Sequence, residues 1–171
     1  MLIKETLGNT AETPLAGKQP EYLYLEWFEI TKRILRKETE AGREVAVKLW
    51  QEGQRLQDGD ILWQDSDTAI VVSILPCEAI VVTPMNLLQM GTICYEIGNK
   101  HLPLFIQDNQ VLVPYEAPLF RLLATTGYEP QIQKRKLLNM LKANVQPHAH
   151  TSESTSSQTL FTKILNLTIK S

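Results

Sequence analysis

The sequence predicts an α+β protein in which a small all-β domain precedes a ferredoxin-like βαββαβ domain and a flexible C-terminal tail. Apolar residues recur with a period of two through the first part of the chain, which is typical of half-buried strands. After Pro76, segments with a helical period alternate with strand-like ones. Beyond Pro147 the sequence is mostly polar. We therefore expect a β-domain at 1–75, a ferredoxin-like domain at 76–147 and a tail at 148–171.

The strands of the first domain follow from simple alternation. In EYLYLEW, Leu23, Leu25 and Trp27 share one face, and REVAVKLW repeats the pattern. QDGDILW and TAIVVSIL follow as further strands, separated by the turn-like QDSD. The paired aspartates of QDGD and QDSD are expected to accept backbone hydrogen bonds in turns, in preference to binding a metal.

The second domain opens with CEAIVV, a nearly continuous apolar run that predicts a buried strand. Thr83 as N-cap and Pro84 at the first helical position predict a helix start. Gly98 is expected to end this helix in the left-handed conformation. The residues that recur at helical spacing, and that we expect to face the core, are Leu87, Met90, Gly91, Cys94 and Ile97.

The remaining elements complete the pattern of this domain. The segment from Leu102 to Ile106 alternates as a strand, QDN at 107–109 predicts a hairpin turn, and QVLVPY resumes the alternation. A second helix is expected from Ala117-Pro118 to Gly127, and YEPQI is expected to form a last strand. The order predicts one sheet of about seventy residues with two helices on one face. KLLNMLKA at 136–143 could extend as a helix.

Composition excludes several classes of function. A net charge of −2 argues against a dominant nucleic-acid role, and the strands lack the aromatic residues of an RNA-binding sheet. No apolar run is long enough to span a membrane, and the first residues do not resemble a signal peptide, so we expect a cytoplasmic protein. The two cysteines, Cys77 and Cys94, are too few for a disulfide framework or a zinc knuckle.

No catalytic motif is present, so we do not expect an enzyme. The chain has three histidines: His101 follows YEIGNK, and His148 and His150 stand in the polar tail. A lone histidine after a helix is most often structural, because one imidazole cannot hold a metal ion tightly. In a two-fold dimer, however, a histidine near the axis meets its own copy, and His-x-His on a tail could complete such a site.

A basic segment, TKRILRKET, lies between two strands of the first domain and carries Lys32, Arg33, Arg36 and Lys37. These residues fit either a solvated strand face or a docking patch for an acidic partner. The sequence leaves both interpretations open.

Four segments resemble the family of the urease accessory protein UreE, the nickel metallochaperones of urease maturation. The segments are MLIKETLGN, LEWFEITKRILRKET followed by REVAVKL, LQDGDIL and YEIGNKHLPLFI. The last has the form Y-x-x-G-N-[KR]-H-x-P-L and is the most specific. The resemblance covers roughly residues 1–147 and implies an N-terminal β-domain and a ferredoxin-like domain that dimerises.

The resemblance also implies a site and a function. His101 matches the family's metal-binding histidine at the dimer interface, and His148 and His150 match its histidine-bearing tail more loosely. It implies Ni²⁺ as the cargo, with Cu²⁺ and Zn²⁺ as competing ions in vitro. The implied partners are a second copy of the chain, the urease apoprotein and urease accessory proteins including the UreG GTPase, with no nucleic acid and no membrane. A metal-independent docking module of a multiprotein assembly is the alternative.

Overall fold

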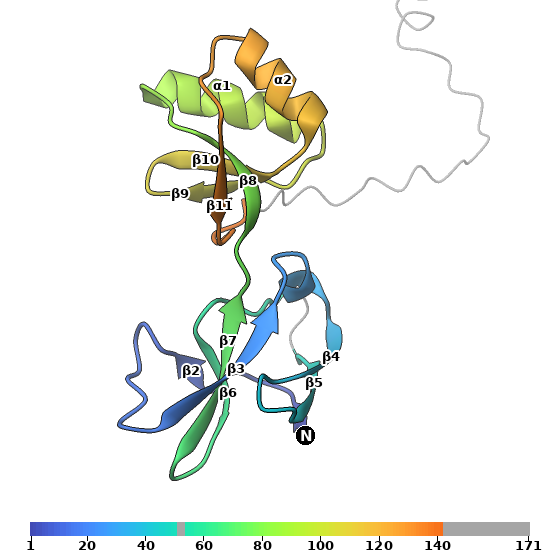
Figure 1. The fold of residues 1–171 in the computed structure, drawn as a ribbon, viewed down its shortest axis with the longest axis vertical. Helices are drawn as coiled ribbons and strands as arrows, with labels where there is room; N and C mark the ends of the chain where they lie inside the picture. The colour runs from blue at the N-terminus through green and yellow to red at the C-terminus, as the bar shows by residue number, and fades with distance from the viewer. Residues whose placement is uncertain (51–53, 142–171) are drawn as a thin grey trace, which may run out of the picture. The chain divides into compact units, whose positions relative to one another are not determined.

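The computed structural model describes residues 1–50 and 54–141. It has the predicted α+β architecture, with a β-rich N-terminal part followed by a β-α-β-β-α-β part (Figure 1). The expected tail, with His148 and His150, lies outside the described residues. Within the described ranges, no helix is both long and apolar enough to cross a membrane.

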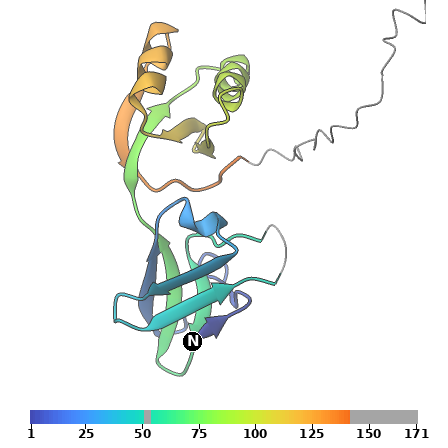
Figure 2. The ribbon, with the colours of Figure 1, turned by 90° about the vertical axis from the view of Figure 1, so that its right-hand side faces the viewer.

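The N-terminal part is built from two sheets. The larger sheet, in spatial order, consists of β2 (Gly8–Asn9), β6 (Asp60–Gln64), β7 (Thr68–Ile74) and β3 (Gln19–Leu25). The smaller sheet, in spatial order, consists of β1 (Leu2–Ile3), β5 (Glu44–Lys48) and β4 (Ile34–Glu38), with the short 3₁₀ helix η1 (Glu29–Thr31) just before β4. Figure 2 shows β4 and β5 side by side as antiparallel neighbours.

The predicted alternation of these strands is confirmed by their burial. Leu23 and Leu25 of β3 are fully buried, as are Val45 and Val47 of β5, and Trp27 packs against the same core. The predicted turn role is also confirmed for Asp65. The side chain of Asp65 accepts hydrogen bonds from the backbone N–H groups of Asp67 and Thr68, at 2.9 Å and 2.8 Å. These bonds lower the pKa of the Asp65 carboxyl.

The C-terminal part has the strand order of a ferredoxin-like sheet. Its elements, in chain order, are β8 (Cys77–Val82), α1 (Leu87–Gly98), β9 (Phe105–Gln107), β10 (Gln110–Pro114), α2 (Ala117–Thr125) and β11 (Gln131–Arg135). The spatial order is β11-β8-β10-β9, and every neighbouring pair is antiparallel. Both helices cover one face of this sheet (Figure 1).

The core of the C-terminal part lies between the helices and that face. Ile80 and Val111 of the sheet pack against Ile93 and Ile97 of α1 and Leu123 of α2, and all five are fully buried. On the opposite face, a second cluster gathers Ala79, Val81, Phe105, Leu112 and Leu137. Each central strand is therefore apolar on both faces, which is why CEAIVV and QVLV contain so few polar residues.

The predicted starting residues of the first helix and of the last strand in this part are wrong. Helix α1 begins after Asn86, whose side-chain oxygen accepts a hydrogen bond of 2.9 Å from the backbone N–H of Gln89. Thr83 does not cap the helix, because its hydroxyl accepts a hydrogen bond of 2.9 Å from the side-chain amide of Gln110 instead. The last strand begins at Gln131, three residues after Tyr128.

The described part of KLLNMLKA is not helical. Residues 136–141 run alongside β9, where Met140 pairs with Phe105 and the N–H of Leu141 donates a hydrogen bond to the carbonyl of Leu104. Leu137 is fully buried against the sheet. Leu137 and Met140 therefore pack on the second face of the sheet, and Asn139, with φ of +57°, interrupts any helix.

Candidate metal centre

The chain reverses direction at His101, immediately after α1. The N–H groups of Asn99, Lys100 and His101 donate to carbonyl groups of the last helical turn, and the last of these bonds runs from His101 to Gly98 at 2.9 Å. His101 has φ of +56°, in the left-handed region. Gly98 has no positive φ and lies inside α1, so the expectation that Gly98 provides the left-handed cap is wrong.

The left-handed conformation at His101 is strained. A residue with a Cβ atom is disfavoured there by about 1 kcal/mol or more, and glycine would adopt it freely. Histidine is tolerated better than most residues in this region, but it has no conformational advantage over glycine. Strained backbone of this kind is concentrated at functional sites, where the side chain is needed for another reason.

The surroundings of His101 hold its backbone and leave the residue accessible. Leu102 packs against the core between the helices and the sheet, and Leu104 is buried. His101 itself is exposed. The imidazole therefore sits on a fixed backbone at the surface, which suits a ligand that must exchange its metal.

Nothing else in the described part of the chain completes a metal site by itself. Residues 1–50 and 54–141 contain no group of three His, Cys, Asp or Glu placed to share an ion. Burial raises the pKa of the thiols of Cys77 and Cys94, and the charge of Glu26 adds to the effect at Cys77. Both cysteines are free and partly buried, so neither is a ready thiolate ligand.

The helix that leads to His101 exposes an apolar face. Leu88 and Tyr95 lie seven residues apart on α1 and are 81% and 72% exposed, and Met85 just before the helix is also exposed. The prediction that Leu87 and Gly91 face the core is wrong, because Leu87 is 86% exposed and Gly91 is exposed too. The core-facing residues are Ile93 and Ile97, joined by the partly buried Met90 and Cys94.

The same face of α1 carries two glycines, Gly91 and Gly98. A Cβ atom added to Gly91 or to Gly98 would meet no atom of the described residues within 4 Å. Neither glycine is therefore required by packing within its own chain, although glycine weakens a helix by roughly 0.5–1 kcal/mol relative to alanine. Small residues on an exposed helix face allow another helix to approach closely. Sequence reasoning missed this face, although the spacing of Leu88, Thr92, Tyr95 and Asn99 at four, three and four residues marks a helical stripe.

Comparison with known proteins places this chain in a family. The family model described as "UreE urease accessory protein, N-terminal domain" matches residues 3–75, and the model described as "UreE urease accessory protein, C-terminal domain" matches residues 78–159. The chain belongs to the UreE family of urease accessory proteins. The second match contains His101 and extends over His148 and His150.

Individual relatives agree with this assignment. The urease accessory protein UreE of Flavobacterium johnsoniae is 49% identical over 98% of this chain and 99% of its own length. UreE proteins of Haemophilus influenzae (strain PittGG) and Actinobacillus pleuropneumoniae are 44% and 42% identical, each over 84% of this chain and 80% and 79% of their own lengths. The family is one of accessory proteins by name.

Proposed function

We propose that this protein is a metallochaperone of urease maturation that binds Ni²⁺ through His101 and delivers it for assembly of the urease active site. Membership of the UreE family supports a role in urease maturation. The observation that carries the nickel site is the position of His101, which is exposed and held in a strained left-handed turn directly after α1. The family names an accessory protein, and we propose no catalytic activity for it.

The proposed site lies on the two-fold axis of a homodimer. One imidazole is a weak site for nickel, and the described residues offer His101 no second histidine. A symmetric dimer supplies the second ligand, since a residue near the axis meets its own copy. The exposed apolar face of α1, with Leu88, Tyr95 and the two glycines, supports this choice of interface.

The chemistry of such a site suits transfer more than storage. Imidazole binds nickel in its neutral form, and a site with few ligands can lose them one at a time to an acceptor. His148 and His150, outside the described residues, are proposed as accessory ligands from the tail. Cu²⁺ should bind at least as tightly as Ni²⁺ by the Irving–Williams order, and Zn²⁺ should compete. Selectivity then comes from the availability of metal and from the receiving protein.

The proposed partners are the urease apoprotein and the urease accessory proteins that act with it, including the UreG GTPase. We also propose that this exchange takes place in the cytoplasm. The boundaries 1–75, 76–147 and 148–171 remain the predicted division between a docking domain, a metal-binding dimerisation domain and a tail.

Calorimetric titration of Ni²⁺ into the full chain tests the proposal. The wild type should bind with a stoichiometry set by the dimer, and His101→Ala should lose the tight component. The matched control is His148→Ala/His150→Ala, which removes two histidines but should keep that component with reduced affinity. Wild-type affinity in dimeric His101→Ala would overturn the assignment of the ligand.

A second candidate function is metal-independent docking by the N-terminal β-domain. One observation favours it: Arg33 and Arg36 are exposed, and neither forms an ion pair with a described residue. If docking is independent of nickel, partner binding survives chelation of the metal but is lost when both arginines are reversed in charge. The two functions are compatible, because a metallochaperone must also contact its acceptor.

A further inference from the structure

The smaller sheet of the N-terminal part has one buried face and one exposed face. Ile3, Leu35, Val45 and Val47 point into the core and are at most 6% exposed. Side chains alternate along strands, so the intervening residues share the other face. That face, which we call the outer face, carries Leu2 and Lys4 from the β1 segment, Ile34, Arg36 and Glu38 from β4, and Glu44, Ala46, Lys48 and Trp50 from the β5 segment.

Large apolar side chains are exposed on the outer face. Leu2, Ile34 and Trp50 are 57%, 60% and 69% exposed. The register puts Ile34 directly opposite Lys48, with Trp50 two residues further along the same face. The ammonium of Lys4 lies 4.8 Å from the centroid of the Trp50 ring. Apolar and cationic groups are therefore interleaved at one end of this face.

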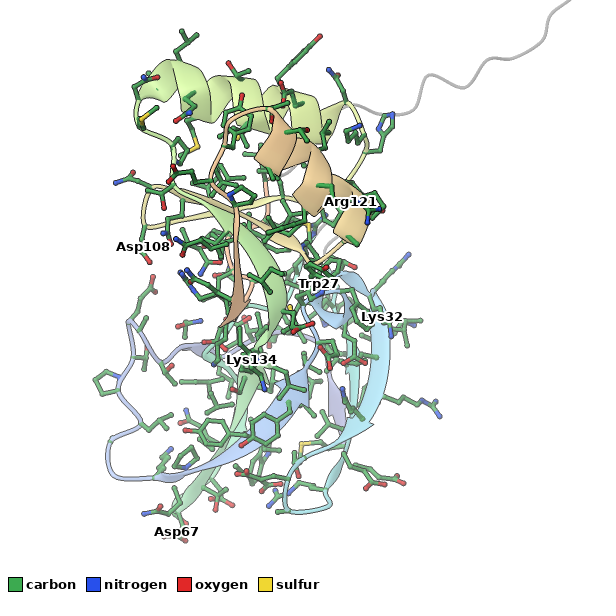
Figure 3. The ribbon with its side chains drawn as sticks, turned by 45° about the horizontal axis from the view of Figure 1, so that its top comes forward. Trp27, Lys32, Asp67, Asp108, Arg121 and Lys134 are labelled. Atoms are coloured by element: carbon green, nitrogen blue, oxygen red, sulfur yellow. The ribbon has the colours of Figure 1, made fainter. Side chains whose placement is uncertain are left out.

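Among the described residues, some cations at this end have a carboxylate partner and others do not. Glu29 forms ion pairs with Lys32 and Lys37 and so neutralises part of the basic segment. In contrast, Arg33, Arg36 and Lys48 form no ion pair within the described part of the chain. Figure 3 shows Lys32 near the beginning of β4, and the register places Lys48 opposite Ile34, the first residue of that strand.

Strand β4 is also an open edge. Among the described residues, it pairs only with β5 in the smaller sheet. The bond from Thr39 N–H to the carbonyl of Arg43 continues this ladder, and bonded pairs recur every second residue, so Leu35 and Lys37 bond to β5. The backbone groups of Ile34 and Arg36 then point away from β5. Beyond β4, Glu40 N–H donates to the carbonyl of Tyr22, which closes the edge there.

From these features we infer that β4 binds an acidic, extended segment of another protein by strand addition. The backbone of the segment pairs with Ile34 and Arg36, its carboxylates meet Arg33, Arg36 and Lys48, and an apolar side chain rests on Ile34. An extended peptide suits the site better than a membrane or nucleic acid, because only a peptide strand can pair with the outward backbone groups of Ile34 and Arg36. The inference deepens the docking function proposed above and does not depend on His101.

Fluorescence anisotropy with the full chain tests the inference. The probe is a short fluorescein-labelled peptide in which glutamate alternates with valine. We expect saturable binding with a Kd below about 100 μM that weakens as salt is raised. A glutamate–serine peptide of equal charge should bind more weakly, and a lysine–valine peptide should not bind. Methylation of the backbone nitrogens of the glutamate–valine peptide should abolish binding, since strand addition needs those N–H groups.

Two variants locate the binding surface. Arg33→Glu/Arg36→Glu should raise the Kd of the glutamate–valine peptide by about tenfold or more. The matched reversal Arg121→Glu/Lys134→Glu, in the C-terminal part, should change this Kd little. Ile34→Pro removes one outward N–H without removing a bond to β5, and edge strands accept proline, so this variant should fold and bind weakly. Circular dichroism confirms folding, and His101→Ala should bind the peptide as the wild type does.

Several results would overturn the inference. Lack of saturable binding by the glutamate–valine peptide would do so, as would undiminished binding in Arg33→Glu/Arg36→Glu. Equal binding of phosphatidylserine vesicles or an RNA oligonucleotide, with the same dependence on the arginines, would show a general anion surface in place of strand addition. None of these outcomes tests the proposal of nickel binding, which is measured separately in the same variants.

Discussion

The backbone N–H of His101 donates a 2.9 Å hydrogen bond to the carbonyl oxygen of Gly98, and this bond closes a turn in which His101 is left-handed. Gly98, which could adopt that conformation without strain, stands three residues too early and stays helical. His101 thus stands at the position where the chain leaves α1. At this residue, backbone stability is in conflict with the proposed role of the imidazole as a metal ligand.

Replacing His101 with glycine should separate these two properties. His101→Gly relieves the left-handed strain and should raise the free energy of unfolding by about 1 kcal/mol, as measured by urea denaturation without metal. The same variant should lose the tight nickel component, because the imidazole is gone. His101→Asn is the matched control, since asparagine also tolerates the left-handed region and should keep near wild-type stability without binding nickel. A lower free energy of unfolding in His101→Gly than in the wild type would contradict the claim that the backbone at His101 is strained.

Leu88 offers a direct test of the proposed dimer. A carboxylate at this position leaves the folded monomer unaffected, because Leu88 is 81% exposed, but it would be desolvated in an interface formed by α1. Leu88→Glu should therefore raise the dimer dissociation constant at least about tenfold. Analytical ultracentrifugation measures the change, and calorimetry should show weaker nickel binding in the resulting monomer.

The control for this variant is Ile132→Glu on β11, where the replaced side chain is 49% exposed but lies on a different element. It should leave the sedimentation of the dimer unchanged. If Leu88→Glu still sediments as the wild type does, the α1 face is not the interface, and His101 needs another source of a second ligand.

Most of the fold follows from local patterns because burial is one-sided in the N-terminal strands and two-sided in β8 and β10. Alternation and continuous apolar runs record these environments directly. The cap of α1 could not be predicted in the same way, since Thr83 and Asn86 are both good caps. Their roles depend on Gln110, which bonds Thr83 from a strand distant in sequence. Residues 136–141 were misassigned for a related reason, because Leu137 packs on a sheet that local sequence does not reveal.

The candidate site was only partly predictable. His101 could be singled out from the sequence, but its backbone strain could not, because left-handed turns are ordinarily assigned to glycine and Gly98 lay close by. The exposed face of α1 could not be predicted from the sequence for another reason. Leu87 and Leu88 are adjacent, and a short amphipathic pattern does not show which leucine faces the core; here neither does.

The hairpin between β9 and β10 provides a test of local backbone strain. Asp108, labelled in Figure 3, and Asn109 have φ of +50° and +60°. Gln107 pairs with Gln110, which defines a two-residue turn with both central residues left-handed. Glycine is favoured at the second of these positions. Asn109→Gly should therefore stabilise the protein by roughly 0.5 kcal/mol, and Asn109→Ala should destabilise it. Thermal unfolding of the two variants checks the sign of each effect.

Glu29 links the stability of the N-terminal part to pH and to the basic segment. Burial alone would raise the pKa of Glu29, but the hydrogen bonds from Lys37 and from the N–H of Glu26, together with the charges of Lys37 and Lys32, lower it below its ordinary value of 4.5. A carboxylate with a lowered pKa stabilises the folded state above its unfolded pKa. That contribution is lost as the pH falls through the lower pKa of the folded state.

Glu29→Gln should consequently cost about 1 kcal/mol of unfolding free energy at pH 7, and the difference from wild type should shrink steadily below pH 4.5. Urea denaturation across this pH range measures both effects, with Glu12→Gln in an exposed turn as the control. The substitution also releases Lys32 and Lys37 from their carboxylate, so the glutamate–valine peptide should bind the variant more tightly at pH 7. Unchanged or weaker peptide binding would mean that these lysines do not face the segment bound at β4.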